Sequence, residues 1–237
     1  MGNISAFLPT LWYGVVPTVE ATAGGIVLAT VASFVAGLAN LSRSRTVRAI
    51  VRIYVEGWRG TSELVQLFWI FFALPLLIHL QLIPLAAGII VLGLNFGAYC
   101  AEIVRGAVQS VPRAQWEGAV ALNFTAAQRM RRVILPQALV EMVPPFSNQF
   151  VQLVQASALI SLIFVHDITY QGLYRLKPNY TAQVLPIFLL MLLLYLILSV
   201  IIVLTMMAVE AWASRVAGRP RRARRARLSA RALLGRV

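Results

Sequence analysis

The residue types that carry hydrolysis or phosphoryl transfer are sparse in this sequence. It contains no HExxH zinc motif, no GxSxG nucleophile motif and no glycine-rich phosphate loop. The only lysine, Lys177, lies in a Leu-Lys-Pro-Asn segment, whereas a P-loop needs a lysine against the nucleotide phosphates. We therefore expect a chain that is not an enzyme and has no catalytic residues, no metal site and no cofactor of its own.

Two histidines and an aspartate are the remaining candidates for catalysis. His166 and Asp167 are adjacent at the edge of an apolar run, and His79 lies at the edge of another. No serine or further histidine is placed by sequence to complete a triad, so an intramembrane hydrolase lacks a nucleophile. We expect His166 and Asp167 to be a solvated pair at the membrane interface, and His79 to be interfacial as well.

Two sets of polar residues fall inside apolar runs, where polar side chains are costly. The first set is Asn95, Tyr99 and Glu102. The second is Asn148, Gln152 and Gln155, with Ser157 and Ser161 beyond it. Spacings of four and three place each set on one face of a helix. Each set either lines a hydrated path for a small polar solute or forms hydrogen bonds between helices, and for Glu102 an ion pair with Arg105 is the alternative.

The composition indicates the elements that must position these residues. Of 237 residues, 59% are hydrophobic and only 12% are charged, with a net charge of +13, whereas soluble domains have about a quarter of their residues charged. Uncharged runs at residues 21–42, 64–101, 142–166 and 178–209 are long enough for helices of about 20 residues that cross a membrane. The single cysteine, Cys100, excludes a disulfide framework. The first nineteen residues lack Lys and Arg, so we expect the first apolar segment to be retained rather than cleaved.

The run at 64–101 is too long for one crossing. At about 1.5 Å per residue it would extend roughly 57 Å, against a hydrocarbon core of about 30 Å. We expect two helices with a turn near residues 81–84, a kink at Pro75, and a close-packing face at Gly93 and Gly97. The preceding segment, 43–63, predicts an amphipathic helix on the membrane surface. The prediction is an all-α membrane protein with five spans.

The basic residues predict the orientation. With five spans, one side of the membrane carries every Lys and Arg except Arg175 and Lys177, and the positive-inside rule makes that side cytoplasmic. The N-terminus is then outside. We expect a membrane domain at 1–214 and a disordered tail at 215–237, whose nine arginines set topology and contact anionic lipid rather than nucleic acid.

A polar segment at residues 111–136 interrupts the apolar chain and predicts a rigid docking surface. Pro112 suits the first turn of a helix, and Asn123 suits the left-handed residue that ends one. Thr125 and Gln128 form a capping-box pattern that starts a second helix. We expect helix, tight turn, helix, and then a stop at Pro136.

Several motifs in this segment and around it resemble one family. Gln115-Trp-Glu-Gly-Ala, Asn123 and Arg131-Arg-Val-Ile-Leu-Pro-Gln-Ala138 resemble the cytoplasmic "EAA" loop of permease subunits of bacterial ABC importers. The polar-amino-acid uptake group of these permeases is similar through further segments, in the same order along the chain. These are Arg59-Gly-Thr-Ser-Glu-Leu-Val-Gln-Leu-Phe68, Asn95-Phe-Gly-Ala-Tyr-Cys-Ala-Glu102, Arg105-Gly-Ala-Val-Gln-Ser-Val-Pro112 and Pro144-Pro-Phe-Ser-Asn-Gln149.

The resemblance implies a multi-pass subunit of the bacterial inner membrane with the fold of type I ABC importers. It implies a second permease, identical or paralogous, a dimer of cytoplasmic P-loop ATPases that bind ATP and Mg²⁺, and an extracytoplasmic binding protein that delivers a small polar solute. By carry-over, the coupling residues that seat in the ATPase are Glu117, Gly118, Ala119, Asn123, Arg131 and Pro136. The solute would pass by alternating access.

This sequence departs from the family pattern at three places. Gly118 replaces the middle Ala of the Glu-Ala-Ala triplet, which costs about 1 kcal/mol of helix propensity, and Asn123 replaces the usual Gly. Gln155-Ala-Ser-Ala158 replaces a common Lys-Asp-Thr-Ser, which favours a zwitterion or a neutral compatible solute over a basic amino acid. Arg59-Gly-Thr-Ser62, Leu122-Asn123 and Gln128-Arg-Met-Arg-Arg132 resemble permeases for ectoine and hydroxyectoine. The competing hypothesis is a membrane scaffold or sensor that docks a cytoplasmic partner through the same loop.

Overall fold

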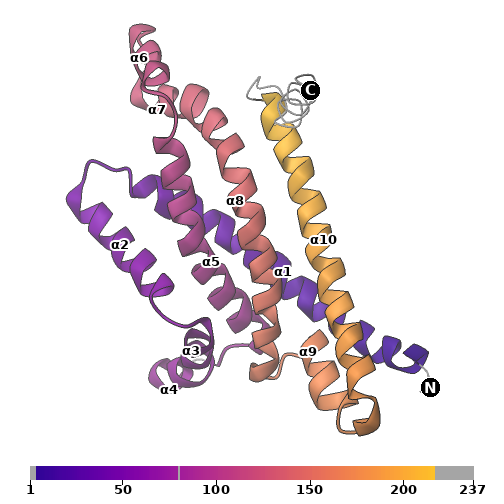
Figure 1. Cartoon of the computed structure of the whole chain (residues 1–237). Helices are drawn as coiled ribbons and strands as arrows, with labels where there is room; N and C mark the ends of the chain where they lie inside the picture. The colour runs from indigo at the N-terminus through magenta and orange to yellow at the C-terminus, as the bar shows by residue number, and fades with distance from the viewer. Residues whose placement is uncertain (1–3, 80, 217–237) are drawn as a thin grey trace, which may run out of the picture. The chain divides into compact units, whose positions relative to one another are not determined.

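The described part of the chain is mostly helical and contains no β-strand. The computed structural model describes residues 4–79 and 81–216 (Figure 1). Its α-helices are α1 (Ile4–Ala39), α2 (Arg45–Arg59), α3 (Glu63–Phe68), α4 (Leu74–Ile78), α5 (Pro84–Gln109), α6 (Arg113–Ala121), α7 (Ala126–Arg129), α8 (Leu135–Ala156), α9 (Ile168–Tyr170) and α10 (Val184–Val216). Wider π-helical turns lie at η1 (Trp69–Ala73), η2 (Met130–Ile134) and η4 (Gln171–Leu176), and 3₁₀ turns at η3 (Ser157–Ile163) and η5 (Thr181–Gln183).

Four helical runs of the described residues are long and apolar enough to cross a membrane. They are Phe7–Ala39, Pro84–Gln109, Ala126–Ile163 and Thr181–Arg215. The number becomes five if Arg45–Arg59 and Glu63–Ile78, which are bent by 103° at a short break, form one broken span. The predicted all-α, multi-span class is confirmed. Of the predicted tail, only residues 215 and 216 lie within the described part, where they complete α10.

The first span starts earlier than predicted. Helix α1 runs without interruption from Ile4 through Pro9, Pro17 and Glu20, so the predicted boundary at residue 21 is wrong. Glu20 is exposed on the surface of this helix. A single acid that points away from the packed face does not end a helix, because the backbone hydrogen bonds continue beneath it.

The described residues form two compact units, and each is described separately. One comprises the described residues up to Arg105 together with Phe146–Val203, and the other comprises Gly106–Pro145 together with the described residues from Leu204 onward. In the first unit, α1 contributes to two apolar clusters. Ala21 and Ala29 pack with residues of α3, α5, α8 and η3, whereas Phe7 and Leu11 pack with residues of α9, η4 and α10. Helix α1 is thus the element that both clusters share.

Two glycines allow α5 to approach its neighbours closely, as predicted. A Cβ at Gly93 would lie 2.6 Å from the Leu28 side chain, and one at Gly97 would lie 2.9 Å from the Cβ of Ala32. Only a residue without a side chain fits at these distances. The predicted break between the second and third spans is also present, since α4 ends at Ile78 and α5 begins at Pro84.

Three π-helical turns each end just before a proline. In each, the residue before the proline donates its N–H to the carbonyl five residues earlier: Leu74 to Trp69, Leu135 to Met130, and Lys177 to Gly172. Proline lacks an N–H, and its ring clashes with the carbonyl four residues earlier. At Pro75 and Pro136 the wider turn accommodates the ring and the helix continues into α4 and α8, whereas after η4 the chain leaves the helix in a turn at residues 177–179. The predicted stop at Pro136 is therefore wrong, because the helical run continues from Ala126 to Ile163.

Candidate functional site

The turn between α6 and α7 is closed by backbone hydrogen bonds. Asn123 has φ 57° and takes the left-handed conformation predicted for it. Its N–H donates to the carbonyl of Val120 (2.9 Å), and the N–H of Phe124 donates to the carbonyl of Ala119 (3.0 Å). This pair of bonds is the Schellman arrangement, which satisfies the free carbonyls at the end of a helix. Asn is the best residue after Gly for this conformation.

The start of α7 carries the predicted capping box. The Gln128 N–H donates to Thr125 Oγ1 (3.3 Å), and the Thr125 N–H donates to Gln128 Oε1 (2.9 Å). Two backbone donors that have no partner inside the helix are thereby satisfied. Pro112 differs from the prediction by one position, since it is the N-cap residue of α6 and not part of its first turn.

Side chains also brace α6 against the helical run that follows it. The guanidinium of Arg129 lies over the Trp116 ring, 5.7 Å from its centroid, within the range of a cation–π contact. Gln137 Nε2 donates to Gln115 Oε1 (3.1 Å) and to the carbonyl of Val133 (3.0 Å). The segment 111–136 is thus held from inside by caps and braces; we call it the coupling loop.

The outer surface of the coupling loop is free of intrachain packing. Glu117 and Gly118 are exposed, and a Cβ at Gly118 would meet nothing within 4 Å. Two neighbouring apolar side chains, Val120 (54% exposed) and Leu122 (70%), are exposed as well. Neither Val120 nor Leu122 is among the predicted coupling residues. Two aliphatic side chains in a short polar segment could have identified this surface from the sequence, because a loop of this size cannot bury them itself.

The other predicted coupling residues fall into two groups. Asn123 and Arg131 are exposed, Asn123 at the turn and Arg131 within η2. Ala119 is buried, and Pro136 is half-buried in the first turn of α8. The structure places Ala119 and Pro136 inside the coupling loop, whereas Glu117, Gly118, Asn123 and Arg131 lie on its surface.

The predicted polar stripe on α8 is uncovered. Asn148, Gln152 and Gln155 are exposed, and none of their side chains hydrogen-bonds another described residue. Their predicted continuation is wrong: Ser157 and Ser161 are buried and donate to the carbonyls of Val154 (2.7 Å) and Ala158 (2.8 Å) within their own helical run. The helix tightens to 3₁₀ geometry at Ser157, so the spacing of the α8 stripe no longer applies there.

The polar stripe on α5 is engaged within the chain. Asn95 is 1% exposed. Its Nδ2 donates to Gln66 Oε1 (2.9 Å) and to the carbonyl of Trp58 (3.1 Å), so it joins α5 to α2 and α3. Tyr99 is half-buried, with the Arg59 guanidinium 5.1 Å from its ring centroid. At this position on α5 the geometry is that of an interhelical contact.

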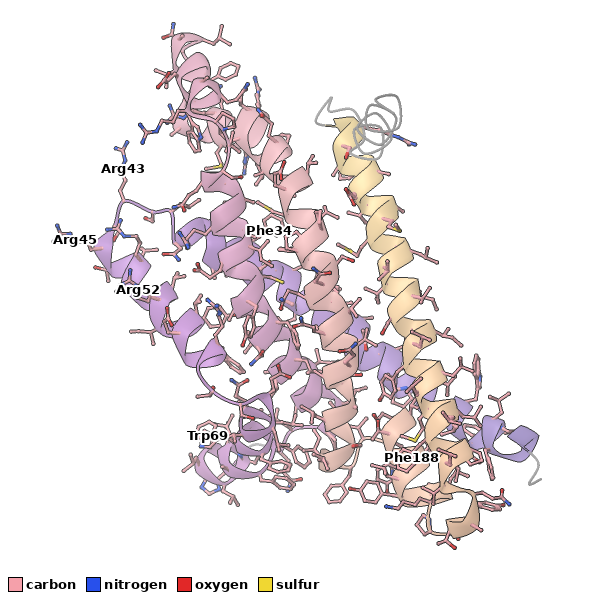
Figure 2. The ribbon with its side chains drawn as sticks, in the orientation of Figure 1. Phe34, Arg43, Arg45, Arg52, Trp69 and Phe188 are labelled. Carbon is pink, nitrogen blue, oxygen red and sulfur yellow. The ribbon has the colours of Figure 1, made fainter. Side chains whose placement is uncertain are left out.

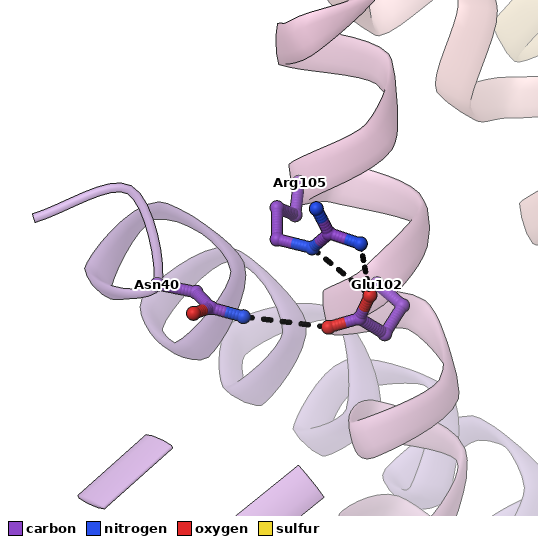
Figure 3. A network of polar contacts seen from close by, with 3 residues as sticks. All are labelled: Asn40, Glu102 and Arg105. Carbon is purple, nitrogen blue, oxygen red and sulfur yellow. Dashed lines mark hydrogen bonds and ion pairs between the residues drawn. The ribbon is translucent and has the colours of Figure 1, made fainter. Parts of the chain in front are cut away.

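Glu102 makes the ion pair that was the alternative interpretation. Its carboxylate accepts hydrogen bonds from Arg105 Nε (2.9 Å) and Arg105 Nη2 (2.6 Å), and its other oxygen accepts one from Asn40 Nδ2 (3.3 Å) (Figure 3). Asn40 follows the end of α1, so the carboxylate links α1 to α5. Charge-assisted bonds of this kind are about twice as strong as neutral ones.

The prediction of a solvated pair at 166–167 holds for His166 and is wrong for Asp167. His166 is exposed and stacks on Tyr170, with ring centroids 4.4 Å apart. Asp167 is fully buried and caps α9, accepting hydrogen bonds from the Tyr170 N–H (2.8 Å) and the Tyr195 hydroxyl (3.2 Å). Burial raises the pKa of the Asp167 carboxyl to about 6, against the opposing effect of these hydrogen bonds.

The surroundings of Asp167 are structural and not catalytic. The Ile168 N–H donates to Thr18 Oγ1 of α1 (3.2 Å). A Cβ at Gly14 of α1 would lie 2.6 Å from the Asp167 backbone. Tyr195 belongs to α10, so Asp167 and its neighbour in sequence hold α1, α9 and α10 together. Its contacts are those of a helix cap. His79, exposed and left-handed (φ 52°), ends α4.

Comparison with known proteins finds transporter permeases among the relatives of this chain. The chain is 40% identical over 220 residues to the probable amino-acid ABC transporter permease protein y4tF of Sinorhizobium fredii, covering 91% of this chain and 92% of that protein. It is 36% identical to the L-cystine transport system permease TcyB of Bacillus subtilis (69% of each chain). It is 34% identical to the glutamine transport system permease GlnP of Escherichia coli (73% and 76%).

Solved structures agree with this. A chain of an amino acid ABC transporter with histidines superposes with a TM-score of 0.78 at 26% identity, over 87% of this chain and 95% of that chain. A chain of the inward-facing MetNI methionine transporter gives 0.75 at 21% identity, over 90% and 99%, which supports the fold alone. The model of the binding-protein-dependent transport system inner membrane component matches residues 25–217. The chain therefore belongs to this family of inner-membrane permease components, as a multi-pass protein of that membrane.

Proposed function

We propose that this chain is the permease subunit of an ABC importer and that the coupling loop docks on a cytoplasmic ATPase. One observation carries the proposal: the coupling loop is braced internally by the Schellman turn, the capping box and the Arg129–Trp116 contact, yet its outer surface is left uncovered. A rigid element with an unpacked apolar and acidic tip transmits a displacement instead of absorbing it. Val120 and Leu122 supply the apolar part of this tip, and Glu117 supplies the charge.

The partners follow from this assignment. The ATPase subunits form a dimer and supply the P-loop, ATP and Mg²⁺, and an extracytoplasmic binding protein delivers the solute. A second permease, a copy of this chain or a paralogue, completes the pathway. With the arginine-rich segments on the cytoplasmic side, the N-terminus is outside and the C-terminus is cytoplasmic.

The exposed stripe on α8 is the part of the pathway that this chain contributes. The side chains of Asn148, Gln152 and Gln155 have no hydrogen-bond partner among the described residues. Uncovered amides facing lipid would be costly, because nothing in the hydrocarbon replaces their hydrogen bonds with water. A water-filled path closed by the second permease removes that cost. Asn95 and Glu102 support the arrangement of the helices around this path, since both make hydrogen bonds that join α5 to other elements of the chain.

The solute is a small zwitterion, either an amino acid or a compatible solute of the ectoine type. The amides of the α8 stripe are neutral, and neutral amides hydrogen-bond a carboxylate and an ammonium group without selecting a net charge. Relatives named for cystine and glutamine support an amino acid. The motif at Gln128-Arg-Met-Arg-Arg132 supports ectoine. Uptake competition with labelled glutamine, cystine and ectoine, using the cognate binding protein, distinguishes them.

The docking assignment is tested by adding bulk at Gly118. Because a Cβ there meets nothing within 4 Å, Gly118→Trp leaves the fold of the chain intact and obstructs only a partner. We expect solute uptake by the reconstituted complex to fall about tenfold or more, which corresponds to about 1.4 kcal/mol of docking free energy, with normal membrane insertion. Gly106→Trp is the matched control, since Gly106 is exposed and equally unobstructed. Unchanged uptake in Gly118→Trp would show that the tip of the coupling loop does not dock on the ATPase. The competing hypothesis, a membrane scaffold, predicts that the chain neither copurifies with an ATPase nor transports solute.

The pathway assignment is tested with single cysteines. Cys100, the only native cysteine, is buried, so Asn148→Cys, Gln152→Cys and Gln155→Cys report without a reactive background. We expect each to react with a membrane-impermeant thiol reagent in the assembled complex, and transported solute to slow the reaction. Val200→Cys, an exposed apolar position on α10, is the control that lipid shields. Equal reactivity at all four positions, with or without solute, would contradict a solute path along α8.

A further inference from the structure

Helix α2 presents three distinct faces, of which only one packs on the protein. On the packed face, Val51 and Val55 are buried against Ala36 of α1 and Ala101 of α5. Tyr54 lies beside them, and its hydroxyl donates to the carbonyl of Leu94 (2.8 Å). This face fixes α2 to the unit that contains α1 and α5, so the other two faces have defined directions.

The second face is cationic and unpaired. Arg45 and Arg52, seven residues apart on one side of α2, are exposed, as is Arg43 in the preceding loop (Figure 2). None of the three has an ion-pair partner among the described residues, although Glu56 lies one turn beyond Arg52. Arg48 secures the loop that carries Arg43, because its Nη1 donates to the carbonyls of Ser42 (2.6 Å) and Arg43 (3.1 Å).

The third face is apolar and also exposed. Ile50 is 63% exposed and Ile53 is 75% exposed. A Cβ at Gly57, one turn after Ile53, would meet nothing within 4 Å. The helix predicted at 43–63 is present, but its apolar residues divide between two faces: Val51 and Val55 pack against α1 and α5, whereas Ile50 and Ile53 are exposed. Water would surround these isoleucines if nothing else covered them.

We propose that the two exposed faces of α2 form a binding site for anionic phospholipid. The isoleucine face lies among the acyl chains near the surface, and Arg43, Arg45 and Arg52 bind the phosphate groups of the lipids. An apolar face beside a row of arginines is the arrangement of helices that lie in the membrane interface. Guanidinium groups bind phosphate through paired hydrogen bonds, and unpaired arginines are available for it. The proposal does not depend on the solute or on the ATPase.

The site is tested by lipid-selective quenching at Ile53. Ile53→Cys, made with Cys100→Ala, is labelled with a small fluorophore and placed in nanodiscs that contain brominated lipids. We expect brominated phosphatidylglycerol to quench more strongly than brominated phosphatidylcholine, with a preference of roughly fivefold for each arginine engaged. Changing Arg43, Arg45 and Arg52 to Gln should abolish the preference while leaving quenching by acyl bromines intact.

The controls separate this site from general attraction. Changing Arg221, Arg222 and Arg224 to Gln removes the same charge from the arginine-rich tail, and the preference at Ile53 should persist. Equal quenching by the two lipids in the labelled protein that retains all its arginines would overturn the proposal. Stronger quenching by bromines near the chain ends would show that α2 spans the bilayer. If the lipids do not quench the fluorophore at position 53, and an added permease or ATPase shields it from solvent, the exposed faces of α2 form a protein interface instead.

Discussion

Replacing the buried carboxylate of Asp167 with an amide should stabilise the protein at alkaline pH. Burial raises its pKa to about 6 from an ordinary value of 3.8. At about 1.36 kcal/mol per pH unit, the ionised carboxylate costs about 3 kcal/mol in the folded chain. Asp167→Asn removes the charge and keeps an oxygen that accepts from the Tyr170 N–H, because Asn is also a good N-cap.

The direction of the pH dependence follows from which state holds the proton. Below about pH 3.8 the carboxyl is neutral in both the folded and the unfolded chain, so the charge costs nothing. Between about 3.8 and 6 the folded chain retains a proton that the unfolded chain has lost, and the stability contribution declines as pH rises. It is fully lost above about pH 6. The wild-type protein should therefore be more stable at pH 5 than at pH 8.

The assay is thermal unfolding of the full chain in detergent, followed by tryptophan fluorescence between pH 5 and pH 8. We expect the wild-type Tm to fall as the pH rises, and the Asp167→Asn variant to have a flatter profile and a higher Tm at pH 8. His166→Gln is the control, because His166 adjoins Asp167 in the sequence and stacks on Tyr170. The same slope in Asp167→Asn and in the wild type would refute the reasoning.

Two further substitutions separate structural from functional roles. Thr125→Ala removes the capping box and should lower the stability of the coupling loop by about 1 kcal/mol, seen as faster hydrogen exchange at residues 126–129; unchanged exchange there would argue against the cap. Asn95→Ala leaves Gln66 Oε1 without its donor and removes one of the two hydrogen bonds to the Trp58 carbonyl, and should cost about 1–3 kcal/mol of stability, measured by thermal unfolding. Uptake per folded molecule should stay close to wild type, and a selective loss of uptake would instead place Asn95 in the solute path.

Most of the features that the sequence predicted well depend on residues close together in the chain. The left-handed Asn123 and the capping box at Thr125 form within a few residues, and the structure contains both. Gly93 and Gly97 were also recognisable, since closely packed membrane helices require small residues. Local patterns suffice where local geometry decides the outcome.

The errors arose where a residue's effect depends on its surroundings. Pro136 was expected to end a helix, but the wider turn before it allows the helix to continue. Glu20 was taken as a boundary, although an acid on the outer side of a helix is tolerated. Asp167 was predicted to be solvated, but the packing of α1 and α10 around it buries it. On α5 and α8, spacing found both polar stripes but could not show which one the protein covers.

The turns before Pro75 and Pro136 have a consequence for the phase of the helices that contain them. A bond to the fifth carbonyl instead of the fourth inserts one residue into the turn, which offsets the side-chain directions on either side by about 100°. A face counted in steps of three and four before such a proline is therefore out of phase after it. Deleting one residue from Trp69–Ala73 should restore a continuous phase, and these turns are the places where homologous helices will tolerate a one-residue insertion or deletion.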